Sequence, residues 1–412
     1  MVSGGDAGGR EAGPDGVVSS SPPVVSNGWC PDKQPLVEPI HQTSAYTFDD
    51  PVLADEAFAQ GEALYARDGL PNVRALERAV AKLEGAEEAI AVASGMAALA
   101  TTCLTLLRSG DHVLVGHDGY CDTSALLEDL AGRFGIVVSR VDLNDPAAVS
   151  AAMTPATRLV LAETISNPGM RLLDLPTIAA ITRPRGITLV VDNTFATPVH
   201  CQPLAWGADA VVHSAGKFLA GHGDITAGIV AGSTTFIESL KRSAYLYGPL
   251  LSPMEAWLTS RGMRTLGPRV MWASQSAARI AGWLQTHPAV ESVQYVGLPS
   301  HDQVDLVRQL LPTGCGSVFT FRLRRKGVAV DFLRQLQAIP YAPTVGGLTT
   351  IASFPPRSQQ LRGPGGPALL PYRSETIRLS IGLEETAELV ADLDAALTGI
   401  AAQANADIGS NG

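Results

Sequence analysis

The chain of 412 residues is long enough for two or three domains, and its 46% hydrophobic and 17% charged content is typical of a soluble globular protein. A net charge of −10 without any basic run argues against a nucleic-acid partner, and no apolar run reaches the roughly 18 residues of a membrane span. The five cysteines, Cys30, Cys103, Cys121, Cys201 and Cys315, are scattered, which favours reduced thiols in a cytoplasmic protein over disulfides or a metal site.

The N-terminal region separates into a tail and an arm. Residues 1–30 are rich in Gly, Ser and Pro and lack the pattern of a signal peptide, so we expect a disordered tail. Residues 31–64 are expected to form an extended arm, because their apolar periodicity is too short to fold alone. The next segment, 70–85, opens with a proline, ends with a glycine and carries apolar residues at helical spacing, which predicts a helix.

Short apolar strands then alternate with helices. The expected strands are 88–95, 112–116, 136–142, 158–163, 187–194 and 209–214, with helices near 96–110, 124–135, 145–153 and 176–182. This alternation predicts parallel βαβ units and an α/β sheet that helices cover on both faces. We therefore assign residues 65–257 to an α/β domain.

The pattern changes after residue 255. Residues 256–288 are predicted to form one long helix that links two domains. Strands at 317–323 and 376–382 then alternate with helices at 328–336 and 385–397, so residues 258–412 are expected to form a smaller α+β domain. A Pro/Gly-rich loop at 356–372 is expected near a site.

Lys217 is the most distinctive of the five lysines, because Ala, Gly, Phe and Leu surround it. Desolvation there would lower its pKa and make it a nucleophile; the alternative is a surface lysine in a loop. A P-loop is excluded, since Val211 stands where the motif needs glycine, and no GxGxxG follows the early strands.

Three further groups of residues lie where predicted strands end, which is where open parallel sheets bind ligands. Ser94-Gly95-Met96 at a strand-to-helix junction could cradle a phosphate, Asp192 follows a buried strand, and Asn167 follows another. Each alone also fits a tight turn, a helix cap or a turn asparagine. Together with Lys217 they match pyridoxal phosphate, which needs a phosphate anchor, a carboxylate on its ring nitrogen and a Schiff-base lysine.

Longer motifs carry a resemblance to a known family. They are YARDGLPNVRALERAVAKLEG, SGMAALA, DNTFATP, HSAGKFLAGHGD, LSPMEAW and IRLSIGLE, spread from about Pro39 to Leu397. The chain resembles the cysteine/methionine-metabolism enzymes of pyridoxal phosphate fold type I: cystathionine γ-synthase, cystathionine γ- and β-lyases and methionine γ-lyase. The resemblance implies the aspartate-aminotransferase-like fold, an α/β protein in which a large, mostly parallel sheet domain binds the cofactor and a smaller α+β domain follows.

The resemblance also assigns roles to residues. Lys217 would bond covalently to pyridoxal 5'-phosphate and shuttle protons, and Tyr120 would stack on the ring as an acid–base group. The resemblance implies that Asp192 contacts the ring nitrogen, Asn167 the ring hydroxyl and Arg378 the substrate carboxylate. The phosphate would be held by Gly95, Met96 and Ser214, and a neighbouring subunit's phosphate by Tyr65 and Arg67. Thr344 occupies the place of the family's serine before its Gly-Gly loop. The Tyr65/Arg67 pair implies an active dimer, usually within a tetramer.

Several positions depart from the family's pattern. The most prominent is Gly216, which replaces a threonine before the lysine and removes one phosphate hydroxyl. The others are Leu64, the run Leu70-Pro71-Asn72, the pair Cys121-Asp122 after the ring tyrosine, and Pro343 in place of a glutamate. These changes remove charged groups, so we expect a smaller, more apolar γ-pocket with Asp122 as a new polar feature, and cystathionine is a less expected substrate.

The predicted activity is γ-elimination or γ-replacement by a lyase or transferase on an L-amino acid with a γ leaving group, such as an O-acyl-homoserine or methionine. The residue types do not decide between the two. A specialised variant that expels halide or phosphate, a cystathionine β-lyase-type β-elimination, and a cofactor-binding protein without turnover remain alternatives.

Overall fold

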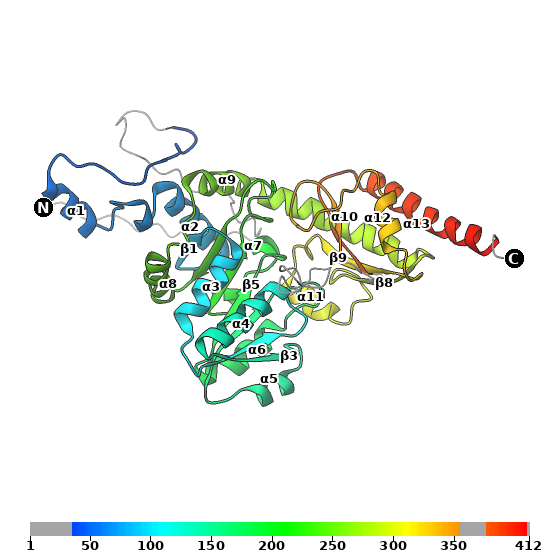
Figure 1. Ribbon diagram of the computed structural model, residues 1–412, viewed down its shortest axis with the longest axis horizontal. Coiled ribbons are helices and arrows are strands. Elements are labelled where there is room, and N and C mark those ends of the chain that lie inside the picture. The colour runs from blue at the N-terminus through cyan, green and yellow to red at the C-terminus, as the bar shows by residue number, and fades with distance from the viewer. Residues whose placement is uncertain (1–34, 355–375, 410–412) are drawn as a thin grey trace, which may run out of the picture.

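The computed structural model describes residues 35–354 and 376–409, with side chains described to residue 402. The expected tail 1–30 and the loop 356–372 lie outside this range. Figure 1 shows the arm and α1 (Pro51–Ala59) at one end of an elongated molecule and the C-terminal helix at the other. No helix of the described part is long and apolar enough to cross a membrane.

The predicted helix at 70–85 is confirmed as α2 (Pro71–Glu84), which follows the short 3-10 helix η1 (Ala66–Asp68). Pro71 provides a preformed first turn, and Gly85 ends the helix in the left-handed conformation at φ 67°. The apolar face of α2 buries Val73, Leu76 and Val80 in the core. This packing holds α2, and with it the point where the N-terminal arm joins the domain, against the protein core.

The large sheet has seven strands in the order β1-β7-β6-β5-β4-β2-β3. They are β1 (Glu88–Val92), β2 (His112–Gly116), β3 (Val137–Val141), β4 (Thr157–Glu163), β5 (Thr188–Asp192), β6 (Ala210–Ser214) and β7 (Gly228–Gly232). β2 to β6 are parallel, as predicted, whereas β7 runs antiparallel to both of its neighbours. The sequence analysis did not anticipate β7. No helix lies between β6 and β7, and a parallel return would need such a crossover.

Helices cover both faces of this sheet, as predicted. They are α3 (Gly95–Leu106), α4 (Cys121–Phe134), α5 (Pro146–Ala152), α6 (Leu175–Thr182), α7 (Thr197–His200) and α8 (Thr234–Tyr247), with 3-10 turns η2 (Arg183–Arg185) and η3 (Pro203–Trp206). Alternate residues of a strand enter different cores: Leu189 and Val191 belong to one cluster, and Val190 to the other. A strand buried on both faces explains the continuous apolar runs in the sequence.

The single long helix predicted for 256–288 is wrong. The segment forms α9 (Pro253–Met263) and α10 (Leu266–Thr286), because the backbone leaves the helix at Thr265 with φ −115° and ψ 14°. Arg269 stabilises this break by donating to Gly262 O at 2.9 Å and to Thr265 Oγ1 at 3.1 Å.

The C-terminal region has its own four-stranded antiparallel sheet in the order β10-β11-β9-β8. Its elements are β8 (Val290–Gln294), α11 (Val304–Leu310), β9 (Val318–Leu323), α12 (Ala329–Gln335), β10 (Ile351–Ser353), β11 (Thr376–Ser380) and α13 (Thr386–Gly409). The expected strands and helices are present, and β8, β10 and α11 are additional. A separate core that includes Phe319, Phe321 and Phe332 supports this sheet. The exact domain boundaries stay a prediction.

Candidate active site

Three neighbouring parallel strands bring polar residues to one edge of the large sheet. Glu163 ends β4 and pairs in register with Asp192, which ends β5, and Asp192 in turn pairs with Val212 of β6. β6 then ends at Ser214, and the turn that follows carries Lys217. The parallel register is therefore what places acid and amine at a common edge.

The Lys217 amine lies in an environment that disfavours its charge. Burial lowers the pKa of Lys217, and the charge of Arg378 adds to this, whereas Asp192 and two other carboxylates oppose it. Its Nζ lies 5.4 Å from the centroid of the Tyr120 ring. A partly desolvated amine beside an aromatic ring and an acid is suited to act as a nucleophile and proton carrier.

The turn around Lys217 is held by groups that the sequence did not single out. The buried Arg269 donates to Phe218 O at 3.0 Å and to Leu219 O at 3.2 Å, and burial lowers the pKa of Arg269 to about 10. From the C-terminal region, Gly346 packs so closely that a Cβ there would lie 2.7 Å from Phe218 N. No local pattern in the sequence distinguishes Arg269 from the other arginines. The Gly-Gly doublet at 346–347 is a signal that could have indicated close packing against this turn.

A cradle for an anion forms at the start of α3. Ser94 caps this helix by accepting from Ala97 N at 3.0 Å, and the next residue, Gly95, sits so close to β6 that a Cβ there would lie 2.7 Å from Ser214 Cβ. Thr194 Oγ1 accepts from Ser214 N at 2.9 Å and orients that turn. Gly95, Met96 and Ser214 are thus brought together at a helix N-terminus, where backbone N–H groups bind phosphate.

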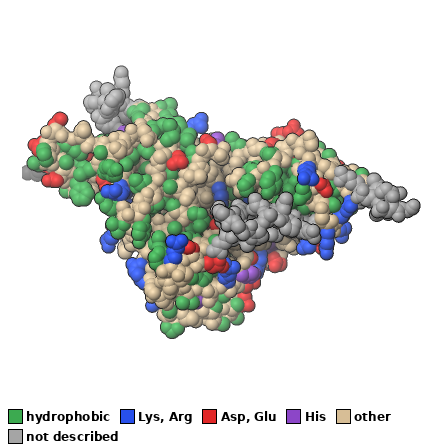
Figure 2. Space-filling model, in the orientation of Figure 1, with side chains coloured by type: hydrophobic (Ala, Val, Ile, Leu, Met, Phe, Trp, Pro, Cys, Tyr) green, Lys and Arg blue, Asp and Glu red, His purple; other side chains and the backbone are tan. Residues whose placement is uncertain are grey.

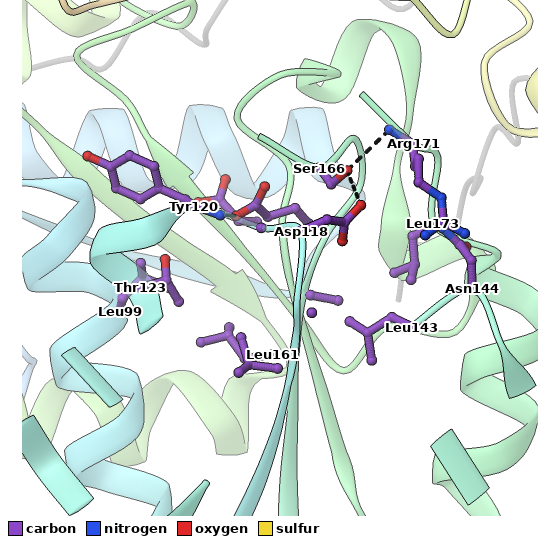
Figure 3. A pocket seen from close by; sticks show the side chains of 16 residues that line it. Leu99, Asp118, Tyr120, Thr123, Leu143, Asn144, Leu161, Ser166, Arg171 and Leu173 are labelled. Carbon is purple, nitrogen blue, oxygen red and sulfur yellow. Dashed lines mark hydrogen bonds between the residues drawn. The ribbon is translucent and has the colours of Figure 1, made fainter. Parts of the chain in front are cut away.

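Glu163 is a site residue to which the sequence analysis gave no role. Its carboxylate accepts from Tyr120 N at 2.5 Å and from Asn167 N at 2.7 Å. Burial, followed by the nearby charge of Asp192, raises the pKa of Glu163 to about 8. A cavity of ≈ 30 Å³ lies next to these residues, between Tyr120 on one side and Arg171 on the other (Figure 3).

Arg378 of β11 reaches this edge from the second sheet. It donates to Asn167 Oδ1 at 3.3 Å, to Ser353 Oγ at 3.2 Å and to Thr344 O at 3.4 Å. Arg378 is 4% exposed, and burial lowers its pKa to about 10. The structure therefore joins the predicted Arg378, Asn167 and Thr344 in one cluster, with a guanidinium suited to a carboxylate.

A buried contact between a histidine and a glutamate supports the strand ends. His213 Nε2 lies 2.6 Å from Glu84 Oε1, with the two side chains at most 1% exposed. Asn193 donates to the same carboxylate oxygen at 3.0 Å. Because His213 precedes Ser214 and Asn193 follows Asp192, this pair ties both strand ends to the C-terminus of α2.

Tyr65 and Arg67 are not part of this cluster within one chain. Tyr65 is 45% exposed, and the Arg67 guanidinium lies 4.6 Å from the ring centroid of Tyr245 and donates to its hydroxyl at 3.4 Å. Arg67 lines a separate cavity of ≈ 140 Å³ with Val92 and Leu250. Their predicted role in a neighbouring subunit stays a prediction.

The residues present fit pyridoxal phosphate. A Cβ would fill the cradle at Gly95, so the phosphate side is shaped by backbone, while Tyr120 offers a ring surface beside the Lys217 amine. Asp192 ends β5, where a carboxylate is suited to pair with a protonated ring nitrogen. The groups that the cofactor requires, a phosphate anchor, an acid, a ring and an amine, thus lie at the same edge of the large sheet.

Comparisons with known proteins agree with this geometry. The model of the family "Cys/Met metabolism PLP-dependent enzyme" matches residues 24–398. The chain is 39% identical to an L-methionine gamma-lyase of Pseudomonas putida over 91% of this chain and 96% of the relative. It is 38% identical to an O-succinylhomoserine sulfhydrylase of Pseudomonas aeruginosa, covering 86% and 89%. The crystal structure of metB from Corynebacterium glutamicum superposes with a TM-score of 0.82 at 31% identity, covering 89% of this chain and 94% of that one.

Proposed function

Because the chain belongs to the Cys/Met metabolism PLP-dependent enzyme family, we propose that it catalyses γ-elimination or γ-replacement on an L-amino acid with a leaving group on Cγ. The observation that carries this proposal is the Lys217 amine of lowered pKa, 5.4 Å from the Tyr120 ring centroid and under the influence of Arg378 and Asp192. The cofactor is pyridoxal 5'-phosphate, which supplies an electrophilic carbonyl and an electron sink when bound.

Each side chain has a task that its position supports. Asp192 would hold a proton on the ring nitrogen, Gly95 and Ser214 would hold the phosphate, and Asn167 would contact the ring hydroxyl. Arg378 would bind the substrate carboxylate in a buried site, where water does not compete with a charge-assisted hydrogen bond.

Proton transfers fall to Lys217 and Tyr120. The Lys217 Nζ, once released, would take the proton from the substrate Cα and return it at a neighbouring carbon, because burial lowers its pKa and so disfavours its charged form. The Tyr120 hydroxyl, on the ring that lies 5.4 Å from this amine, would donate a proton to the departing γ-group.

The γ-chemistry is supported by the relatives' names, a gamma-lyase and a sulfhydrylase. A β-elimination is the second candidate, favoured by 35% identity to a chloroplastic cystathionine beta-lyase of Mimosa pudica. Expulsion of halide or phosphate is a third form of the same γ-chemistry.

The test is a substrate screen with product analysis. Methionine, O-acetyl- and O-succinylhomoserine, cystathionine and γ-halogenated analogues are offered with and without an added thiol. We expect 2-oxobutyrate and ammonia for elimination, or a thioether for replacement; products of β-substituted substrates alone would contradict the proposal. Lys217→Ala should abolish the absorbance band of the lysine-bound cofactor, and an unchanged band would contradict the role of Lys217.

We also propose that the active unit is a dimer, assembled as a homotetramer. Apolar side chains lie exposed over the arm and the end of α8 (Figure 2), among them Phe58 at 65% and Leu246 at 74%, and such patches mark interfaces. Mixing Lys217→Ala with Arg67→Ala subunits tests the shared site: a mixed dimer keeps one intact site, so a 1:1 mixture should regain about a quarter of the activity. No recovery would contradict the role of Arg67 in a neighbouring subunit. A cytoplasmic location is proposed on the scattered cysteines, four of which form no disulfide within the described residues.

A further inference from the structure

Asp122 gives this site a carboxylate directly beside its aromatic acid–base group. The Tyr120 hydroxyl donates to Asp122 Oδ2 at 2.8 Å. Asp122 lies in the first turn of α4, where the helix dipole favours a negative charge. Its charge also reaches Lys217, whose pKa it raises against the effect of burial. The Asp122 carboxylate therefore contacts the Tyr120 phenol and also influences the pKa of the Lys217 amine, and these are the two groups proposed to transfer protons.

We propose that Asp122 is a positioning residue for Tyr120: it fixes the phenol over Lys217 and keeps its proton in place for transfer to the leaving group. This inference rests on the proposed function. A carboxylate that accepts the phenol hydrogen bond opposes formation of a phenolate next to it, because two negative charges would face each other. Tyr120 then remains protonated as the general acid, while Lys217 acts as the base.

Four other charged or titratable groups lie near the Tyr120 phenol. They are Lys217 from the turn after β6, Arg378 from β11, Glu163 at the end of β4, and Cys121 on α4 itself. Lys217 and Arg378 favour a phenolate, so without the carboxylate of Asp122 the phenol would lose its proton at lower pH. The carboxylate of Asp122 thus opposes the loss of the phenol proton.

The importance of the Asp122 carboxylate should depend on the leaving group. A thiolate or an alkoxide leaves slowly unless it is protonated as its bond to Cγ breaks, whereas a halide leaves with the bonding electron pair and needs no proton. Loss of the Asp122 carboxylate should therefore slow the thiol-releasing reaction more than the halide-releasing one. We expect Asp122→Asn to lower kcat with methionine at least tenfold and to change kcat with a γ-chloro analogue less than threefold, on the scale that general acid catalysis contributes.

The experiment compares wild type, Asp122→Asn, Asp122→Glu and Asp129→Asn on both substrates. Asp129 also lies on α4 but pairs with exposed Arg133 at 2.8 Å, so it controls for a lost helix carboxylate. Asp122→Glu should recover part of the thiol-releasing rate. A second readout needs no turnover: the phenolate absorbance of the holoenzyme, taken as the difference from a matched Tyr120→Phe variant, should reach its midpoint about one pH unit lower in Asp122→Asn.

The outcomes separate the two proposals. If wild type expels no γ-group from methionine, an O-acyl-homoserine or the γ-chloro analogue, the proposed function fails. If wild type is active but Asp122→Asn slows both substrates equally, or the phenolate midpoint does not move, the role of Asp122 is overturned while the function stands. A selective loss with the thiol substrate and a lowered midpoint support the inference.

Discussion

Restoring the family's threonine at position 216 should harm this protein. The resemblance suggests that Gly216→Thr would add a hydroxyl to the phosphate site. In the structure, a Cβ at Gly216 would lie 2.5 Å from Ile225 O, 3.1 Å from Thr226 Cα and 3.3 Å from Ala227 N. All three are backbone atoms, which cannot rotate away. The loop 225–227 must therefore shift before any side chain fits.

The size of the penalty follows from what that shift breaks. Overpacking that moves backbone costs roughly 1–3 kcal/mol. Ala227 O also accepts from Ala215 N at 2.8 Å and from Gly216 N at 3.3 Å, and the weakening of these bonds, worth about 0.5–1.5 kcal/mol each, is part of this cost. We expect Gly216→Ala to lower the free energy of unfolding by about 1–3 kcal/mol, with Gly216→Thr the more destabilised of the two.

The assay is thermal or denaturant unfolding of both variants, with cofactor affinity measured by absorbance titration. Gly282→Ala is the matched control: this glycine lies in α10 with no atom within 4 Å of an added Cβ, so it should gain up to about 1 kcal/mol from helix propensity. A Gly216→Thr variant that keeps full stability and binds the cofactor more tightly than wild type would refute the reasoning.

Three further outcomes follow from the site. Arg378→Ala should raise KM by the equivalent of about 2–5 kcal/mol while the cofactor absorbance persists; loss of the cofactor would instead contradict its role in substrate binding. Glu84→Ala should destabilise the protein by about 1–3 kcal/mol, because the buried His213 and Asn193 lose a hydrogen-bond partner, whereas exposed Glu128→Ala should change the melting temperature little. Glu163 has a pKa of about 8 in the folded chain against an ordinary 4.5, so the folded state holds an extra proton between these values. The stability of the cofactor-free protein should therefore fall as pH rises across this window, and in Glu163→Gln the slope should flatten; an unchanged slope in urea titrations would contradict the raised pKa.

Most of the elements of the large domain and the candidate site residues could be predicted from the sequence. Alternating apolar runs predicted β1 to β6 and their helices because a strand buried on both faces must be apolar throughout. Asp192 and Lys217 stood out as candidates because one follows a buried apolar strand and the other lies among apolar residues, where a charge is costly. Caps such as Pro71 and Gly85 are local signals as well, and they marked α2 correctly.

Contacts between distant segments were decided only by the tertiary structure. The antiparallel β7 and the break at Thr265 depend on which segments meet, and no local pattern encodes that. Arg269 and the Glu84–His213 pair looked like ordinary charged residues until folding buried them against the turn and strand ends they support. Gly216 is the sharpest case: in the sequence it is a missing hydroxyl, whereas in the fold it is the space that the backbone of 225–227 occupies.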